Sequence, residues 1–384
     1  MMAAELILWS AVALVLYAYA GYPCALVVLS RFRRRTLHKR PFQPRVSFII
    51  TAHNEEARLA GKIANTLGQD YPSGDFEIIV ASDCSTDRTD DIARSYGAAV
   101  RLVRAPSRRG KEAAQQLAIN AASGEILVFS DVATALAPNG VSTIVANFSD
   151  PTVGCVSSVD RFVDADGRTS GEGAYVRYEM WLRRLETEVN SLVGLSGSFF
   201  AARRDVCRIW AADRQSDFST LLNTVEKGYR GVLDVESAGY YTNIVDERRE
   251  FGRKVRTVVR GIAVLADHVR MLNPLRYGLF AWQLASHKLC RWLVPFAMTL
   301  AWFSNAALLN DAPFYLGLFV MQCGFYAAAL GGVMSGARVL KLPAFLVVAN
   351  LGVLVAWIRY ARGERMTTWN PSARMGTLPP AAYR

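Results

Sequence analysis

The chain has 384 residues, of which 52% are hydrophobic, and carries a net charge of +11. This length suits one sizeable globular domain with additional segments. A basic chain can bind nucleic acid, but here the basic residues gather beside apolar runs, which indicates a membrane surface instead. The six cysteines are scattered and form no Cys-x-x-Cys pair, so we expect neither a zinc site nor a disulfide framework.

Residues 1–30 are predicted to form a membrane anchor. From Glu5 to residue 30 the only charge is on Glu5 itself, and about 20 apolar residues are enough to cross a bilayer. A cleaved signal peptide is the alternative, but its basic residues usually precede the apolar core. Here six basic residues follow it, within residues 31–40. A retained anchor with its carboxyl side in the cytoplasm is therefore favoured.

The middle of the chain, residues 44–262, alternates short apolar runs with helical patterns. Strands are predicted at 45–52, 76–82 and 125–131, and helices at 54–69, 85–97 and 110–124. Asn54 is predicted to cap the first of these helices. Such alternation predicts an α/β domain with a mainly parallel sheet, in which ligands bind beyond the carboxyl ends of the strands. Polar residues gather at three of those ends, 51–55, 82–87 and 130–134. No Walker or G-x-G-x-x-G pattern occurs, which disfavours a nucleoside triphosphatase or a dinucleotide oxidoreductase.

A second membrane region is predicted over residues 293–360. It contains about three helices, at 293–309, 313–332 and 343–360, with no charged residue before their last few positions. These helices are typical of anchors rather than of an ion pathway. Before them, residues 266–292 interleave leucine, phenylalanine and tryptophan with basic residues, which predicts an amphipathic interfacial helix. A soluble helix packed on the globular domain is the alternative.

Residues 361–384 form a polar, basic tail. With the middle domain in the cytoplasm, three carboxyl-terminal crossings would leave the arginines of this tail outside, against the positive-inside rule. A re-entrant span, a further crossing and an exception to the rule all remain open. In each case we expect a multi-pass protein of the cell membrane.

Three segments of the middle domain occur in a recognisable order. They are VSFIITAHNEE (46–56), IIVASDCSTDRT (78–89) and ILVFSDVAT (126–134). Together they resemble the nucleotide-sugar half of membrane-bound family 2 glycosyltransferases, the inverting GT-A-fold enzymes that include cellulose and hyaluronan synthases. The resemblance extends over residues 46–262, and flanking membrane helices are usual in that group. It implies a Rossmann-like GT-A domain at 44–262.

The resemblance also implies residues that bind the donor. Ala52 and Glu55 match positions of a family segment, Pro-Ala-Tyr-Asn-Glu, that lines the nucleoside pocket. Asp83 matches the aspartate that reads uracil, and Lys111 a lysine near the donor whose charge suits a diphosphate. Taken alone, Glu55 could instead favour the start of a helix, and Lys111 could be a surface charge.

Asp131 resembles the first acid of the family's Asp-x-Asp motif, which holds a divalent cation against the diphosphate. Ala133 stands where the second acid is expected. Mg²⁺ or Mn²⁺ often uses one or two carboxylates together with phosphate oxygens, so a metal at Asp131 is still predicted. The alternative is a site without metal, in which Lys111 and the arginines after Glu250 neutralise the leaving group.

Asp217, in RQSDFSTLL (214–222), matches the family's catalytic acid, which takes the proton of the acceptor hydroxyl. An aspartate that caps a helix is the alternative reading. The segment 195–206 resembles the family's acceptor-side strand, which implies that Ser196, Gly197 and Ser198 border the acceptor site.

The segment FGRKVRTVVRG (251–261) occupies the place of the Gln-x-x-Arg-Trp motif of processive synthases. Arg256 matches the arginine and can bind phosphate oxygens. Thr257 replaces the tryptophan, which argues against a processive enzyme. A basic amphipathic helix at the membrane surface explains the same residues.

These observations predict an inverting hexosyltransferase that uses a UDP-sugar and a glycan or lipid-linked acceptor at the membrane. Ala133 and Thr257 keep an alternative open, a catalytically weak nucleotide-sugar-binding partner of a polysaccharide synthase complex. A transport or scaffold protein is a further class. The lack of ionisable residues within the predicted spans argues against transport.

Overall fold

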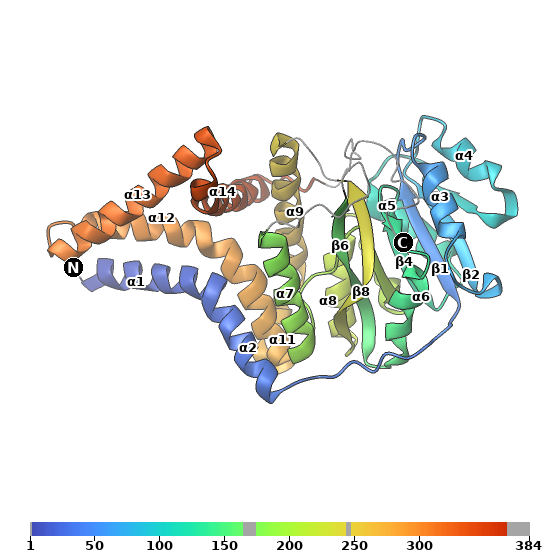
Figure 1. Ribbon diagram of the computed structural model, residues 1–384, viewed down its shortest axis with the longest axis horizontal. Coiled ribbons are helices and arrows are strands. Elements are labelled where there is room, and N and C mark those ends of the chain that lie inside the picture. The colour runs from blue at the N-terminus through green and yellow to red at the C-terminus, as the bar shows by residue number, and fades with distance from the viewer. Residues whose placement is uncertain (1, 164–173, 243–246, 367–384) are drawn as a thin grey trace. The chain divides into compact units, whose positions relative to one another are not determined.

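The computed structural model describes residues 2–163, 174–242 and 247–366, so most of the predicted basic tail lies outside the described residues. The chain divides into two compact units (Figure 1). We call them the helical unit, made of Met1–Val28, Arg248–Ile262 and Val269–Arg365, and the sheet unit, made of Leu29–Glu247, Ala263–His268 and Met366–Arg384.

The sheet unit contains one eight-stranded sheet in the order β3-β2-β1-β4-β7-β6-β8-β5. The strands are β1 (Val46–Ala52), β2 (Phe76–Ser82), β3 (Arg101–Arg104), β4 (Ile126–Asp131), β5 (Ala135–Leu136), β6 (Val153–Val163), β7 (Phe199–Arg203) and β8 (Arg230–Thr242). Strands β3, β2, β1 and β4 are parallel to their neighbours in this half of the sheet, whereas β7 is antiparallel to both β4 and β6. The predicted α/β fold is confirmed, with a mixed sheet whose first four strands form the parallel half.

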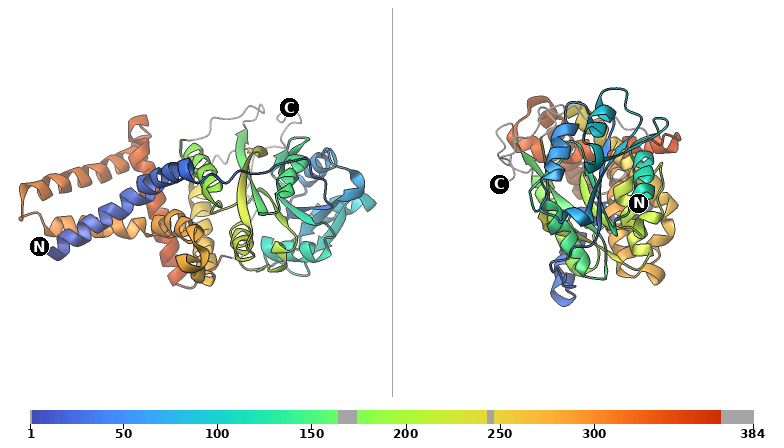
Figure 2. Two further views of the ribbon diagram at one scale, coloured as in Figure 1. Left: turned by 90° about the horizontal axis from the view of Figure 1, so that it is seen from below. Right: turned by 90° about the vertical axis from the view of Figure 1, so that its right-hand side faces the viewer.

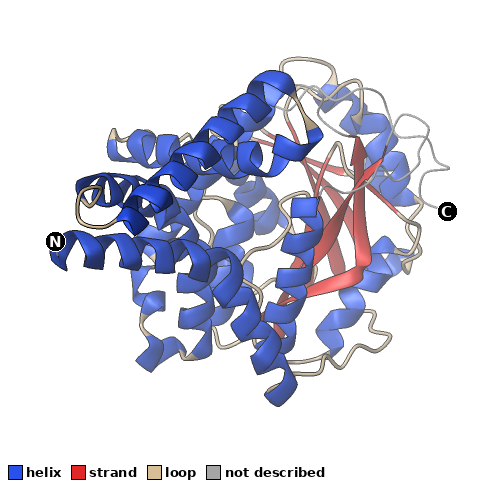
Figure 3. Ribbon diagram, turned by 60° about the vertical axis from the view of Figure 1, so that its left-hand side comes forward, coloured by secondary structure: helices blue, strands red, loops and turns tan. Residues whose placement is uncertain are grey.

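Helices pack on the sheet (Figure 3). They are α3 (Leu59–Leu67), α4 (Thr89–Ser95), α5 (Lys111–Ala121), α6 (Gly140–Val145), α7 (Ala174–Val189) and α8 (Ser216–Glu226). Every residue of β1 is buried, as expected for a central strand covered on both faces. The main core includes Phe48, Ile50 and Val128, together with Leu59 and Ile63 of α3.

Two predicted helices are shorter than the sequence pattern indicated. The helix expected over 54–69 begins only at Leu59, and the one expected over 85–97 begins at Thr89. Asn54 was predicted to cap the first helix, which is wrong. It has a left-handed backbone (φ 51°), and its side-chain oxygen accepts a hydrogen bond from the backbone N–H of Thr86 at 2.9 Å. The residues after β1 and β2 therefore form loops that bond to each other.

The helical unit contains α1 (Met2–Leu16), α10 (Pro274–Tyr277), α11 (Leu279–Leu284), α12 (Arg291–Ala307), α13 (Pro313–Ser335) and α14 (Lys341–Ala361). It also contains most of α2 (Tyr22–Phe32) and of α9 (Glu247–Asp267), whose remaining residues belong to the sheet unit. The prediction of one helix over 266–292 is wrong, because that stretch breaks into short helices. Asn273 caps α10 ahead of Pro274, and Gly278 has a positive φ of 53°.

Three helical segments are long and apolar enough to cross a membrane: Met2–Phe32, Pro313–Ser335 and Arg338–Ala361. They correspond to the first, third and fourth predicted spans. The predicted span 293–309, which falls on α12, is not among them. However, α12 lies beside α1 (Figures 1 and 2), where Ala297 and Ala301 pack against Leu8.

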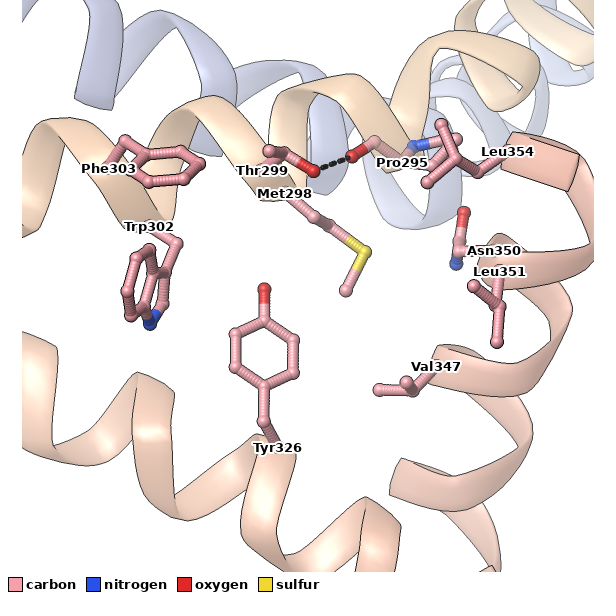
Figure 4. Close-up of a pocket in the computed structure, with 10 residues that line it drawn as sticks. All are labelled: Pro295, Met298, Thr299, Trp302, Phe303, Tyr326, Val347, Asn350, Leu351 and Leu354. Carbon is pink, nitrogen blue, oxygen red and sulfur yellow. Dashed lines mark hydrogen bonds between the residues drawn. The ribbon is translucent and has the colours of Figure 1, made fainter. Parts of the chain in front are cut away.

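A pocket of about 330 Å³ lies among α12, α13 and α14 within the helical unit (Figure 4). Its walls are mainly apolar and aromatic, with Trp302 and Phe303 from α12 and Tyr326 from α13. Thr299 donates its hydroxyl to the backbone oxygen of Pro295 at 2.9 Å, as expected for a threonine in an apolar helix. None of the predicted site residues lines this pocket.

Candidate active site

The first three motifs meet at one edge of the sheet because β1, β2 and β4 are parallel. Ala52 pairs with Ser82 across β1 and β2, and Thr51 pairs with Asp131 across β1 and β4, so all three strands end at the same level. The backbone N–H of Asp83 then donates to the oxygen of Ala52 at 2.9 Å. His53 Nδ1 donates to the backbone oxygen of Asp83 at 2.7 Å. The predicted clustering of polar residues at these strand ends is confirmed.

Asp83 is fully buried and bonds to the backbone ahead of α5. Its Oδ1 accepts from the N–H of Arg109 and its Oδ2 from the N–H of Gly110, both at 2.9 Å. Lys111, the first residue of α5, follows directly. Asp83 therefore positions Lys111. Contact between Asp83 and a nucleotide base stays a prediction. In this structure the side chain of Asp83 is not exposed to solvent, and both carboxylate oxygens already accept backbone hydrogen bonds.

Glu55 is buried at the loop that precedes α3. Its carboxylate forms an ion pair with Arg58 at 2.7 Å, and its backbone oxygen accepts from the N–H of Leu59 at 2.9 Å. Burial raises the pKa of Glu55, and the negative charge of Asp131 adds to this rise, although Arg58 opposes it. Glu55 thus supports the start of α3 through its backbone oxygen, and its predicted part in donor binding remains a prediction.

Lys111 connects the end of β4 to the segment before β7. Its Nζ lies 2.5 Å from Oδ1 of Asp131 and donates to the backbone oxygen of Gly197 at 3.0 Å. The N–H of Asp131 donates to the oxygen of Ser198 at 3.0 Å. Lys111 is thus a partner of Asp131 rather than a surface charge.

Asp217 lies in the first turn of α8 and faces the same glycine. A Cβ atom built on Gly197 would stand 2.9 Å from Oδ2 of Asp217, so that carboxylate packs directly against the glycine. Gln215 donates its side-chain amide to the same oxygen at 3.2 Å, and the N–H of Phe218 donates to Oδ1 at 2.8 Å. Asp217 is not the N-cap residue of α8, which is Gln215, although it accepts one N–H of the first turn. Its carboxylate also packs against the segment that contacts Lys111 and Asp131.

The predicted acceptor residues Ser196 and Ser198 use their hydroxyls within the protein. Both donate to Oδ1 of Asp160 on β6, at 2.5 and 2.7 Å. Asp160 was missed from the sequence, because it lies inside an ordinary strand pattern. The structure places it one hydrogen bond away from the residues on either side of Gly197.

Lys62 was also missed. It lies on α3 with 3% of its surface exposed, and its Nζ donates to Ser130 Oγ at 2.7 Å and to the oxygen of Thr134 at 2.6 Å. Burial lowers the pKa of Lys62 to about 7, and the nearby charge of Asp131 partly opposes this. A lysine on the apolar face of α3 was the available signal, since buried lysines without a contacting carboxylate are rare away from functional sites.

The residues around Asp131 fit a hard cation only if the ligand brings oxygens of its own. Among the described residues, no three His, Cys, Asp or Glu side chains gather to hold a metal ion. Asp131 supplies one carboxylate, already paired with Lys111. Mg²⁺ and Mn²⁺ accept such a site when substrate phosphates complete the coordination.

Arg256 lies on α9 in the helical unit. Its predicted part in donor binding remains a prediction, as does the role of Asp131 as a metal ligand.

The sheet unit, with acids and a lysine gathered beyond the ends of β1, β2 and β4 and an antiparallel strand beside them, has the GT-A fold. The family model described as glycosyl transferase family 2 matches residues 47–210, which is less than half of the chain.

Known proteins resemble from about half to nearly all of the chain. The beta-monoglucosyldiacylglycerol synthase of Nostoc sp. is 27% identical over 201 residues, which cover 50% of this chain and 43% of that protein. The N-acetylglucosaminyltransferase of Azorhizobium caulinodans is 27% identical over 191 residues, covering 48% of this chain and 46% of that protein. The matches thus span less than half the length of these curated relatives. The mannosyltransferase PcManGT from Pyrobaculum calidifontis, solved with GDP-Man and Mn²⁺, has a TM-score of 0.72 at 22% identity, covering 93% of this chain and 99% of that chain.

Proposed function

We propose that the protein is an inverting hexosyltransferase that moves a sugar from a nucleotide-diphosphate sugar to a glycan or lipid-linked acceptor at a membrane. The observation that supports this most is the line of contacts from Asp131 through Lys111 and Gly197 to Asp217. It joins a residue suited to the diphosphate with a residue suited to act as the base. The name of the Nostoc relative, a glucosyldiacylglycerol synthase, supports an acceptor that contains a lipid.

In this proposal the oxygen of an acceptor hydroxyl attacks the anomeric carbon on the face opposite the diphosphate. The bond from that carbon to the acceptor oxygen forms as the bond to the diphosphate oxygen breaks, and the hydroxyl proton passes to Asp217. Lys111 stabilises the departing diphosphate by its charge. The fixed positions of Lys111 and Asp217 on either side of Gly197 orient donor and acceptor for this displacement.

Asp131 is the residue we propose to hold Mg²⁺ or Mn²⁺ together with the diphosphate. When bound, such a cation neutralises charge on the leaving group. Asp131→Ala is expected to abolish the metal-dependent part of nucleotide binding while the fold remains. Calorimetric titration of UDP with and without Mn²⁺ measures this directly, and an unchanged metal dependence would refute the assignment.

The nucleotide is proposed to be UDP, on the match of Asp83 to a uracil-reading aspartate. Because Asp83 bonds to the backbone ahead of Lys111, we expect Asp83→Asn to weaken binding of UDP and GDP alike unless the base also contacts it. A screen of UDP- and GDP-sugars, read by nucleotide release, distinguishes the two roles of Asp83. A loss with both nucleotides indicates that Asp83 positions Lys111, whereas a loss with UDP alone indicates contact with the base.

The sheet unit is proposed to lie on the cytoplasmic side of the cell membrane in a multi-pass protein. The support is the basic cluster at residues 31–40 directly after the apolar segment Met2–Phe32. Protease added to inside-out vesicles should digest the sheet unit, whereas right-side-out vesicles should protect it. The opposite pattern would reverse the orientation.

The alternative is a catalytically weak partner that binds a nucleotide sugar without transferring it. Ala133 and the ion pair between Lys111 and Asp131 favour it, because both reduce the negative charge available to a metal. The deciding experiment uses the full-length protein in detergent with radiolabelled UDP-sugars and membrane extract. An enzyme releases UDP faster than its Asp217→Asn variant, while both bind UDP equally. Equal release from the two proteins would support the binding partner.

A further inference from the structure

Asp160 is a carboxylate in the candidate active site to which the proposed mechanism gives no task. It lies on β6 and is partly exposed. Its Oδ1 accepts hydrogen bonds from the hydroxyls of Ser196 and Ser198, which also lie 3.0 Å from each other. Within the described part of the chain, Oδ2 of Asp160 has no hydrogen-bond partner. One oxygen is thus held firmly by the protein, and the other remains for a ligand.

The position of Asp160 is fixed relative to the proposed base. Ser196 and Ser198 flank Gly197, against which Oδ2 of Asp217 packs. Three consecutive residues therefore hold both carboxylates, with Asp217 at the middle residue and Asp160 at the outer two. Both carboxylates therefore contact the segment 196–198, which is the basis for assigning Asp160 to the acceptor side of the site.

On the side of β8, Asp160 has a glycine as its strand partner, and the backbone there lies close to neighbouring residues. Asp160 pairs with Gly239 of β8, and a Cβ atom on Gly239 would stand 2.9 Å from Cγ2 of Thr134 and 3.7 Å from Ser198 Oγ. Glycine at 239 lets β8 come close to Thr134, in the loop 132–134 that follows β4. Asp160 consequently lies between that loop and the segment that carries Gly197, within the same polar region.

A carboxylate fixed in this way selects the chemistry of its ligand. An ionised carboxylate only accepts hydrogen bonds, so its complement is a hydroxyl or an N–H group. Two carboxylates that contact one short segment, residues 196–198, also repel an anionic ligand such as a phosphate. A sugar residue, which has several hydroxyls and no charge, satisfies both carboxylates at once.

We propose that Asp160 binds a second hydroxyl of the acceptor and so makes the protein specific for an uncharged glycosyl acceptor. The proposal rests on the proposed transferase function. Asp160 takes no proton and forms no bond to the donor, since the attacking hydroxyl gives its proton to Asp217. An acceptor with a single hydroxyl, such as diacylglycerol, or with a terminal phosphate, gains nothing from Asp160.

Three synthetic acceptors with the same chain test this assignment: octyl glucoside, octanol and octyl phosphate. The full-length protein is assayed in a detergent without sugar head groups, with the donor found in the nucleotide-sugar screen. We expect transfer to octyl glucoside to exceed transfer to the other two. Asp160→Ala should raise KM for octyl glucoside by about tenfold or more, since it removes a hydrogen bond to a charged group. The weak transfer to octanol and the affinity for UDP should stay unchanged.

Asp205→Asn is a matched control, because it removes a carboxylate from the same unit at a residue that contacts Tyr229 and Lys227. It should leave all three rates unchanged. Asp160→Asn, which keeps the shape but not the charge, should improve the acceptance of octyl phosphate relative to wild type. Both results support a contact with the acceptor rather than support of the fold.

Several outcomes would overturn the inference. One is an equal loss of transfer to octyl glucoside and octanol in Asp160→Ala, and another is weaker UDP binding by that variant. A wild-type preference for octanol or octyl phosphate, or a natural product from membrane extract whose new sugar lies on a phosphate or a lone hydroxyl, has the same consequence. Failure of the transferase function is distinct, because it appears as equal UDP release by wild type and Asp217→Asn.

Discussion

The two sides of the candidate active site, which we propose to hold the donor and the acceptor, are built in different ways. On the donor side, the parallel strands β1, β2 and β4 end at one level, and each is followed by a short motif. On the acceptor side, β6 and β7 are antiparallel. Asp160 precedes the segment 196–198 in the chain and Asp217 follows it, and both contact that segment. Parallel strands gather their carboxyl ends at a single edge, whereas antiparallel strands bring together residues that no local motif connects.

The two sides also differ in the charges that they bury. On the donor side, Lys62 is fully enclosed by protein, with neutral oxygens as its hydrogen-bond partners. On the acceptor side, Asp160 is partly exposed and receives two hydroxyl bonds. Burial of the Lys62 ammonium group without a contacting carboxylate lowers the stability of the fold. A role in the proposed donor site would explain why a lysine stands there.

Replacement of Lys62 by methionine is expected to have the largest effect of the changes considered below, and to act on stability. The pKa of Lys62 is about 7 in the folded protein against 10.5 for an unperturbed lysine. Between these pH values the unfolded chain binds more protons than the folded protein, so the free energy of unfolding rises with pH. The destabilisation caused by the buried lysine is complete below about pH 7 and decreases as pH rises above it. Over two pH units this amounts to about 3 kcal/mol at most. Lys62→Met should therefore unfold several degrees higher than wild type at pH 7, with a smaller difference at pH 9.

Thermal unfolding in detergent at the two pH values measures this, with Lys227→Met as a control at an exposed lysine in the same unit. The same variant should bind UDP more weakly, because the 130–134 loop loses the ammonium that holds Ser130 and Thr134. A variant that is less stable than wild type to the same degree at both pH values would show that Lys62 is an ordinary structural residue.

Replacement of Gly197 by alanine tests the acceptor side. In Gly197→Ala the new methyl group would lie 2.9 Å from Oδ2 of Asp217, closer than a Cβ contact allows, so that carboxylate must move. A displacement of about 1 Å at a catalytic group costs roughly 100-fold in rate. We expect kcat to fall by about that factor while the affinity for UDP, measured by calorimetry, is retained. A fall in UDP affinity with unchanged kcat would mean that this glycine belongs to the donor side.

The sequence predicted the donor side well because strand periodicity and motif order are local properties. Strands β1, β2 and β4 and the convergence of Asp83, Lys111 and Asp131 follow from them. The acceptor side required knowledge of pairing. Asp160 belongs to no motif in the sequence, and only the pairing of β6 with β7 brings it to Ser196 and Ser198.

Two features of the donor side, the conformation of Asn54 and the burial of Lys62, could not be predicted from the local sequence pattern. The Asn54 capping signal is local and typical, yet a hydrogen bond to the Thr86 backbone outweighs it. The lysine at 62 occupies a position where helical periodicity predicts an apolar residue. In both cases a contact between distant parts of the chain decides the conformation, and no short window of sequence contains both partners.

The smallest expected effect comes from restoring the second motif acid. Ala133→Asp adds a carboxylate two residues after Asp131, and a second oxygen ligand should raise the affinity for Mn²⁺ in the presence of UDP by several-fold, up to about tenfold. The gain is limited because Lys111 already neutralises Asp131 at 2.5 Å and would compete with the metal. Titration of Mn²⁺ into the UDP complex measures the change, and Ala133→Asn controls for side-chain size. An affinity that does not rise would mean that the lysines, and not a cation, supply the positive charge on the donor side, which would make the two sides differ in chemistry as well as in topology.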